Sequence, residues 1–475
     1  MTRVITKQKL ILIIFFICII SRIATGIYYI EDIDSLRFAL SVQEYDIVKL
    51  QPHFPGYPIF CFFAQILFFF TNNLGLSFSI IGGISVFIII YFSLKLFQIQ
   101  LNTLYGISCA SLIFMNPFFW LMSNRYMPDL LGLSISIVVL YFLIIKAEKF
   151  NSVILGFFLT GVLAGIRLSY TPLLFLPIGI HLLKNNKIYY PIFGFSVGCL
   201  IWLIPLIWIT GLNDLYQSAV KQTSGHFLDF GGTIITDGIW KYRALSMIRS
   251  IWADGLGGYW PGRSLQTLFV SIPMLYFFYQ GVNKKDFRSL EKNDLIIIVS
   301  VFIYIVWIFF FQNIIYKSRH ILPIIVFCIV LLNNGVHYFK KDNKIFNNVL
   351  FVILFFGLTN VTFVLVNQHT KPSAISSLKD NLLSQSNKVA IASIPLVNYY
   401  LKQHGLKNQF LEIENSNDIE KIKLLGEENL ILIGNFKESF QSDYYISNES
   451  VHYHNPYVNR MWSELSMHRL IKKTK

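Results

Sequence analysis

Long apolar runs recur along most of this chain, and they constrain its fold more than any other feature. Hydrophobic residues fill 54% of the 475 positions. Many of the runs exceed the roughly 18 residues that a helix needs to cross a bilayer. Spanning segments must be helical, because unpaired backbone groups are too costly in hydrocarbon. The sequence therefore predicts an α-helical polytopic membrane protein.

The net charge of +14 does not indicate nucleic-acid binding. The basic residues form small groups at the ends of apolar runs and do not cluster on one domain, a pattern typical of membrane topology. All five cysteines lie inside apolar runs and none is in a metal-type pair. These features predict a lipid bilayer as partner, with no nucleic acid and no disulfide or zinc role for the cysteines.

The apolar run at 57–70 decides the topology. At about 14 residues it is short for a span and typical of an interfacial or re-entrant helix. If it spanned, every later basic group would lie outside; if it does not, all are cytoplasmic, as the positive-inside rule predicts. These groups lie at 146–149, 184–187, 284–292 and 340–344. We therefore place this helix on the outer surface and the N-terminus, with Arg3, Lys7 and Lys9, in the cytoplasm.

This topology gives about eleven transmembrane helices. They are predicted at 8–26, 76–97, 103–123, 129–147, 152–169, 171–184, 188–210, 264–282, 294–314, 321–339 and 345–367. The outer regions are then 27–74, 123–129, 211–263 and 316–320.

The composition turns polar near residue 369. KVAIASIP and NLILIGNF have the pattern of buried strands, and SNDIEKIKLLG between them has the pattern of a helix. We expect a transmembrane domain at 1–368 and a small soluble α/β domain at 369–475, outside the cytoplasm. His452 and His454 are either metal ligands or, as we favour, alternate residues of a strand.

Two acids are brought to the outer face by separate helices. Asp34 precedes a helical pattern, so it is either an N-cap, with Glu31 and Asp32 as ordinary loop acids, or a base at the membrane surface. Asp129 follows Pro128 at the start of a span, and it is likewise either a helix cap or a functional acid. Their shared face favours a catalytic pair.

Basic residues on the outer side break the positive-inside rule. They are Arg125, Arg167, Lys317 and Arg319. Positive charge retained there, partly at membrane depth, is costly and indicates function, with a phosphate or an anionic lipid headgroup as the natural partner. Snorkelling to ordinary headgroups is the alternative.

The long outer loop at 211–263 contains QTSGHFLDFGG and ADGLGGYWPG. Glycine, aromatic and acidic residues together suit a sugar-binding lid, with His226 in a substrate-binding role. Alternatively, these residues serve only to fold the loop onto the surface.

At this point the chain resembles the GT-C superfamily of membrane glycosyltransferases, nearest to the protein O-mannosyltransferase and aminoarabinose (lipid A) transferase branches. The resemblance covers residues 8–370 and rests on the order and membrane side of short motifs. They are DSLRFA from Asp34, PHFPG around His53, Asp129 itself, and KSRHILP from Lys317.

The resemblance implies a polyprenyl-phosphate-linked sugar donor and a lipid, glycan or protein acceptor outside the cytoplasm. The family's catalytic acid falls on Asp34, although Ser35 stands where many relatives have Glu; the spacing to Arg37 favours Asp34 over Asp32. The second acid falls on Asp129. Transfer would invert the anomeric centre. Donor or phosphate binding is expected of Arg37, His53, Arg125, Arg167, His226, Lys317 and Arg319.

Several alternatives stay open. A divalent metal, Mg or Mn, could bridge the two acids and the phosphate, although the sequence establishes no cofactor. A transporter or flippase of lipid-linked glycans is the main rival, and a surface-glycan polymerase or ligase is the second. The many Asn, Lys, Ile and Phe residues suggest an AT-rich bacterial genome, so we expect a multi-pass protein of the bacterial inner (cytoplasmic) membrane.

Overall fold

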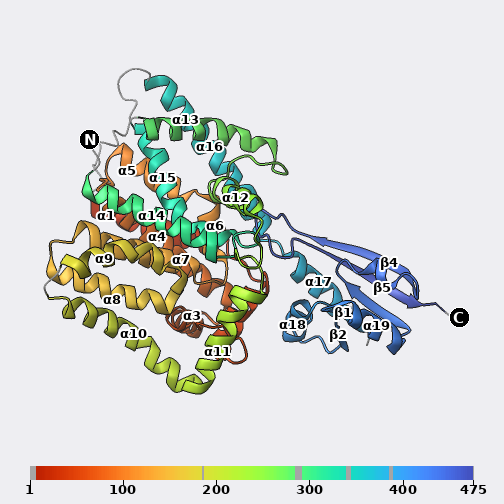
Figure 1. Ribbon diagram of the computed structural model, residues 1–475. Coiled ribbons are helices and arrows are strands. Elements are labelled where there is room, and N and C mark those ends of the chain that lie inside the picture. Colours follow the sequence, from red (N-terminus) through yellow and green to blue (C-terminus); the bar gives the residue numbers. More distant parts are fainter. Residues whose placement is uncertain (1–6, 185–186, 284–290, 338–343, 385–388, 474–475) are drawn as a thin grey trace. The chain divides into compact units, whose positions relative to one another are not determined.

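The computed structural model describes residues 7–184, 187–283, 291–337, 344–384 and 389–473. The chain folds into two compact units (Figure 1). The helical unit comprises Met1–Tyr28 and Arg37–Asn367, and the C-terminal unit comprises Tyr29–Leu36 and Gln368–Lys475. Residues 29–36 thus fold with the tail of the chain. The basic residues of 284–290 and 340–343 lie outside the described residues.

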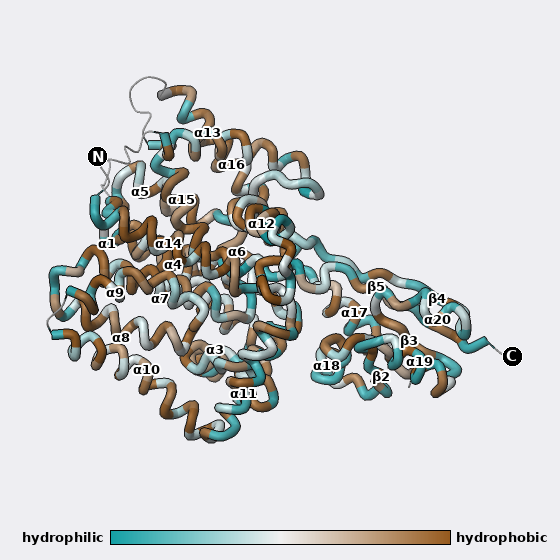
Figure 2. The backbone as a smooth tube through the Cα atoms, in the orientation of Figure 1, coloured by the Kyte–Doolittle hydropathy of each residue, from teal (hydrophilic) through white to brown (hydrophobic). Residues whose placement is uncertain are grey.

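The helical unit is built from long apolar helices (Figure 2). Its first half contains α1 (Lys7–Ala24), α2 (Ile33–Gln43), α3 (Pro58–Thr71), α4 (Leu74–Leu96), α5 (Leu104–Phe114), α6 (Pro117–Asn124), α7 (Asp129–Leu140), α8 (Phe150–Arg167) and α9 (Phe175–Lys184). Its second half contains α10 (Tyr189–Thr210), α11 (Leu212–Ser224), α12 (Trp240–Arg249), α13 (Leu268–Asn283), α14 (Lys292–Phe311), α15 (Leu322–His337) and α16 (Lys344–His369).

Among the described residues, six helical segments are long and apolar enough to cross a membrane, or seven if the bent pair α5 and α6 forms one span. The α-helical polytopic class is therefore confirmed, while the number of eleven spans stays a prediction. The span expected at 103–123 is broken, with a bend of 52° between α5 and α6. The break has a local cause: the Asn116 side chain accepts from the Phe119 N–H, and Pro117 at the first position of α6 has no N–H to continue α5.

The predicted short helix at 57–70 is confirmed as α3. It is followed by α4, which packs against α1, α6 and α7. Gly82 permits the close approach to α6, because a Cβ there would lie 1.8 Å from the Ser123 carbonyl oxygen. These contacts fix the start of α7, where Asp129 lies.

The C-terminal unit has a five-stranded sheet of order β2-β1-β3-β5-β4. The strands are β1 (Ala390–Ser393), β2 (Phe410–Glu412), β3 (Asn429–Ile433), β4 (Tyr444–Tyr453) and β5 (Glu464–Lys472), and the helices are α17 (Ala374–Leu383), α18 (Pro395–Gln403), α19 (Ser416–Leu425) and α20 (Lys437–Phe440). The first three strands of that order run parallel and the last two pairings are antiparallel.

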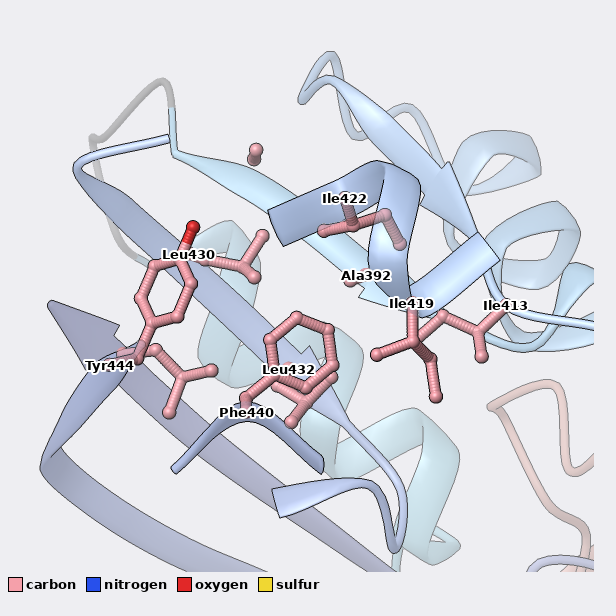
Figure 3. Close-up of a cluster of buried hydrophobic side chains, with 10 residues drawn as sticks. Ala392, Ile413, Ile419, Ile422, Leu430, Leu432, Phe440 and Tyr444 are labelled. Atoms are coloured by element: carbon pink, nitrogen blue, oxygen red, sulfur yellow. The ribbon is translucent and has the colours of Figure 1, made fainter. Parts of the chain in front are cut away.

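Apolar side chains from the sheet, from α19 and from α20 form a core cluster of this unit, among them Leu432, Ile419 and Phe440 (Figure 3). The predicted strands and the helix between them are confirmed as β1, β3 and α19. The sequence did not predict α18 and β2, which form a parallel crossover unit with β1.

Candidate active site

Three helix ends of the helical unit bring charged side chains together in its interior. Asp129 is the first residue of α7, Arg167 is the last residue of α8, and Arg319 lies in the short 3₁₀ turn Ser318–Ile321 that precedes α15. Arg167 Nη2 lies 2.8 Å from Asp129 Oδ1, and Arg319 Nε lies 3.9 Å from the same oxygen. All three residues are buried. Sequence reasoning singled out all three, and the structure joins them.

The helix ends suit the charges of Asp129 and Arg167. A carboxylate at a helix N-terminus and a guanidinium at a C-terminus are each stabilised by the helix dipole. The cap position of α7 is Pro128, not Asp129. The alternative in which Asp129 serves as a cap is therefore wrong, because its carboxylate instead pairs with Arg167.

Tyrosines complete the surroundings of Arg167. The Tyr57 hydroxyl accepts from Arg167 Nη1 at 3.3 Å and lies 3.1 Å from His53 Nε2. The guanidinium also lies over the rings of Tyr57 and Tyr170, each at 5.7 Å, and Tyr304 contacts Tyr170 edge-on. His53 thus connects to the charged cluster through Tyr57. Sequence reasoning missed the tyrosines, although Tyr57 directly follows the PHFPG motif.

The charges of this cluster favour an anion over a metal ion. Two guanidinium groups face one carboxylate, which leaves one positive charge in excess. The Nε–H of Arg167 is buried and makes no hydrogen bond to any residue that the structure describes. Within that part of the chain, no group of three or more His, Cys, Asp or Glu side chains could hold a metal ion. A divalent cation beside Asp129 would also be repelled by its two arginines.

Other predicted binding residues lie elsewhere in the helical unit. Arg125 directly follows α6 and is buried, with Nη1 3.9 Å from Met122 Sδ. His226 Nε2 lies 2.8 Å from the Phe311 carbonyl oxygen. Lys317 and Arg37 are half-buried, the former directly before the turn that holds Arg319 and the latter in α2. Their substrate-binding roles stay predictions.

Asp34 lies in the part of α2 that belongs to the C-terminal unit. It is buried in the first turn of the helix. The cap of α2 is Asp32, whose Oδ1 accepts from the Ser35 N–H at 2.8 Å. The alternative in which Asp34 caps the helix is therefore wrong, since Asp32 accepts the hydrogen bond from the Ser35 N–H that a cap would accept.

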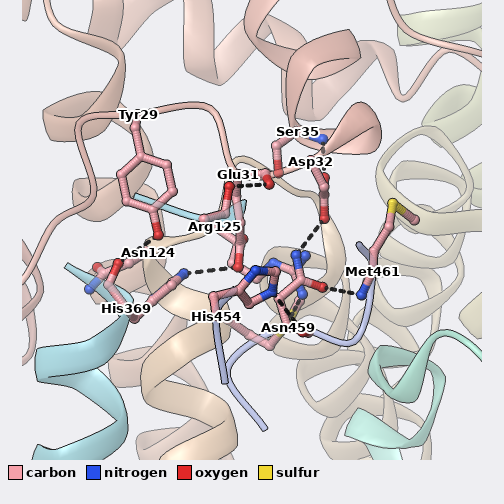
Figure 4. A network of polar contacts seen from close by, with 12 residues as sticks. Tyr29, Glu31, Asp32, Ser35, Asn124, Arg125, His369, His454, Asn459 and Met461 are labelled. Atoms are coloured by element: carbon pink, nitrogen blue, oxygen red, sulfur yellow. Dashed lines mark hydrogen bonds and ion pairs between the residues drawn. The ribbon is translucent and has the colours of Figure 1, made fainter. Parts of the chain in front are cut away.

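Glu31 and Asp32 are buried and are not ordinary loop acids, since both have polar partners in the same unit (Figure 4). His369 Nε2 lies 3.2 Å from Glu31 Oε1, and the Asn459 side-chain amide donates to Asp32 Oδ2 at 3.1 Å. His452, predicted as a strand residue, lies in β4 with Nδ1 3.1 Å from the Ser377 hydroxyl, while His454 follows the strand.

Neither a protein-family model nor a curated protein matches this sequence. Solved structures do match. A crystal structure of ArnT from Cupriavidus metallidurans bound to undecaprenyl phosphate aligns over 97% of this chain and 97% of its own, with a TM-score of 0.52 and 8% identity. The chain has the GT-C fold.

Two further structures agree with the GT-C fold. ArnT in the apo state covers 97% of this chain and 98% of its own, with a TM-score of 0.51 and 9% identity. An oligosaccharyltransferase from Archaeoglobus fulgidus, in complex with Zn and sulfate, covers 88% of this chain and 67% of its own, with a TM-score of 0.50 and 10% identity. The expected fold class is therefore confirmed.

Proposed function

We propose that this chain is an integral-membrane glycosyltransferase that moves a sugar from a polyprenyl-phosphate donor to an acceptor on the extracytoplasmic face. The supporting observation is the buried cluster of Arg167 and Arg319 around Asp129, in a chain with the fold of a transferase that binds undecaprenyl phosphate. The cluster has an excess positive charge and an unused buried donor, which a lipid phosphate would satisfy.

The basic residues have distinct parts in this proposal. Arg167 and Arg319 contact the donor phosphate, because a guanidinium presents several donors in a fixed plane. Lys317 and Arg125 add positive charge. Tyr57 orients Arg167, to which its hydroxyl is bonded. The polyprenyl chain remains in the bilayer, and Arg37, His53 and His226 bind the sugar or its phosphate.

Asp34 is the proposed general base. The acceptor oxygen attacks the anomeric carbon while the Asp34 carboxylate takes its proton. The bond from that carbon to the phosphate oxygen breaks, and its electron pair leaves with the lipid phosphate. The anomeric centre inverts in this single displacement. The arginines stabilise the second negative charge that the departing phosphate gains.

No metal ion is needed in this scheme, because the arginines supply positive charge to the leaving group. The acceptor is a lipid, a glycan or a protein segment that reaches the outer face of a bacterial inner membrane. The N-terminus is then cytoplasmic and the C-terminal unit extracytoplasmic.

The test follows lipid-phosphate release, which does not depend on knowing the acceptor. Protein in nanodiscs receives a panel of undecaprenyl-phosphate hexoses and pentoses together with cell-envelope extract, and free undecaprenyl phosphate is measured by mass spectrometry. We expect release with at least one donor, and a fall of about 10²- to 10⁴-fold in Asp34→Asn.

Glu44→Gln is the matched control, because Glu44 is an exposed acid of the same outer segment that pairs with Lys49. It should release undecaprenyl phosphate at the wild-type rate. Near-full activity in Asp34→Asn would remove Asp34 as the base. Movement of a lipid-linked sugar across the bilayer without any release would favour the flippase instead.

A further inference from the structure

Four consecutive residues of the first outer segment are held by the tail of the chain, within the C-terminal unit. The Tyr29 hydroxyl donates to the His369 carbonyl at 2.8 Å. The carbonyls of Ile30 and Glu31 accept from the hydroxyls of Tyr400 at 2.5 Å and Ser373 at 2.8 Å. The fourth contact is the one from Asn459 to Asp32.

The contacts from Ser373 and Asn459 are buried, and the two that involve Tyr29 and Tyr400 are partly buried. Glu31, Asp32, His369 and Tyr400 are each at most 1% exposed. Hydrogen bonds shielded from water hold their geometry more strictly than exposed ones, since breaking one leaves a polar group without solvent. The tail therefore fixes the path of residues 29–32 immediately before Asp34.

Asp32 passes this constraint on to α2. One of its oxygens accepts from the Ser35 N–H and the other accepts from the Asn459 amide (Figure 4). A carboxylate whose two oxygens both accept hydrogen bonds cannot rotate about its Cβ–Cγ bond without losing one of them. The first turn of α2, which carries Asp34, is thus oriented by a residue of the tail.

Asn459 is itself fixed in one orientation. Its Oδ1 accepts from the Met461 N–H at 3.0 Å, so the amide nitrogen must face Asp32. The backbone carbonyl oxygen of Asn459 lies 2.9 Å from His454 Nε2. On the other side of the ring, His454 Nδ1 accepts from the Ala374 N–H at 3.0 Å. Because a backbone N–H can only donate, the proton of neutral His454 lies on Nε2 and is donated to Asn459.

We infer that Asn459 is a positioning residue for the transfer reaction: through Asp32 it sets the orientation of Asp34 at the start of α2. This inference rests on the proposed role of Asp34 as base. The C-terminal unit then takes part in catalysis by holding the first outer segment, although it supplies no reacting atom.

The test exchanges the two partners of one hydrogen bond. Asn459→Asp sets two buried carboxylates against each other, and Asp32→Asn sets two amides against each other. In the double variant, the amide at position 32 can donate to the carboxylate at position 459. The Ser35 and Met461 N–H groups keep an acceptor in that variant. We expect each single variant to lower kcat for undecaprenyl-phosphate release by about 10- to 100-fold, as expected of a displaced catalytic group.

Two readouts separate positioning from general destabilisation. The donor KM should stay near the wild-type value, because the phosphate-binding arginines are unchanged. Hydrogen exchange of the peptide covering 33–43 should accelerate in the single variants and return to wild type in the double variant. Asn398→Ala is the control: Asn398 is buried in the same unit and donates to the Leu411 carbonyl, so its loss should lower thermal stability without lowering kcat.

Recovery of most of the lost kcat in the double variant would establish the positioning role. Wild-type kcat in both single variants, with Asp34→Asn inactive, would overturn this role and leave the proposed function intact. Single variants that lose kcat without recovery in the double variant would also overturn it. An active Asp34→Asn enzyme would instead overturn the assignment of the base.

Discussion

Removal of Arg167 should destabilise the helical unit by leaving Asp129 as a buried, undercompensated carboxylate. At an effective dielectric constant of about 20, the attraction is about 6 kcal/mol for the 2.8 Å pair with Arg167 and about 4 kcal/mol for the 3.9 Å pair with Arg319. The free-energy cost of removing the three charges from water offsets much of both attractions. Breaking a buried pair typically loses about 3–5 kcal/mol. Because Arg319 remains, we expect Arg167→Met to lose about 3 kcal/mol, the lower end of that range.

A double-mutant cycle isolates this pair. Wild type, Arg167→Met, Asp129→Asn and the double variant are unfolded by denaturant in detergent micelles, and tryptophan fluorescence reports the transition. The double variant removes both charges, so its loss should fall short of the sum of the single losses by about 2 kcal/mol. Lys402→Met is the control, since the Lys402–Glu412 pair is exposed and its loss should stay within about 1 kcal/mol.

Additive losses would refute this reasoning. A loss below about 1 kcal/mol in Arg167→Met would also refute it, because a buried carboxylate without its nearest cation should lower the free energy of unfolding by more than that. Either result would mean that water or another cation reaches Asp129.

Three further predictions concern packing, pH and topology. Gly82→Ala should abolish folded protein, judged by monodispersity in gel filtration, because its Cβ would meet the backbone of α6; Gly179→Ala, with open space around it, should behave as wild type. Burial lowers the pKa of His404 and of His468, so both are neutral in the folded C-terminal unit and protonation favours unfolding. The thermal midpoint of this unit should therefore fall as the pH drops below about 6.5, and a midpoint unchanged between about pH 7.5 and 5.5 would contradict this. A topology reporter fused at 99–102 should give a cytoplasmic signal. An outer signal would make 57–70 a span and set Asp34 and Asp129 on opposite faces of the membrane.

Long helices and their ends could be read from the sequence because length, apolarity and proline position determine them locally. The end of α8 at Arg167 and the short α3 after its prolines are examples. The strands β1 and β3 were equally clear, since a short β-branched or aliphatic run between polar segments suits a buried strand. The break before Pro117 was not foreseen, because the apolar run continues through it.

Partners inside the unit were harder to predict. Tyr57 and Tyr304 stand among many aromatic residues, and nothing local distinguishes a tyrosine that contacts a buried arginine from one that faces lipid. The Asn459–Asp32 contact joins positions 427 residues apart, so no local pattern could reveal it. The N-cap of α2 is Asp32 rather than Asp34 because the helix begins at Ile33, two residues earlier than a cap at Asp34 would place it.

The central claim, that this protein binds a polyprenyl phosphate through its charged cluster, is tested most directly by comparing two lipids. Affinities of the wild-type protein in nanodiscs are measured for undecaprenyl phosphate and for undecaprenol, which has the same chain without the phosphate. Charge-assisted contacts to the arginines predict that undecaprenyl phosphate binds at least about tenfold more tightly, with the difference lost in Arg319→Gln. Equal affinity for the two lipids would contradict the account, because the cluster would then make no use of the phosphate.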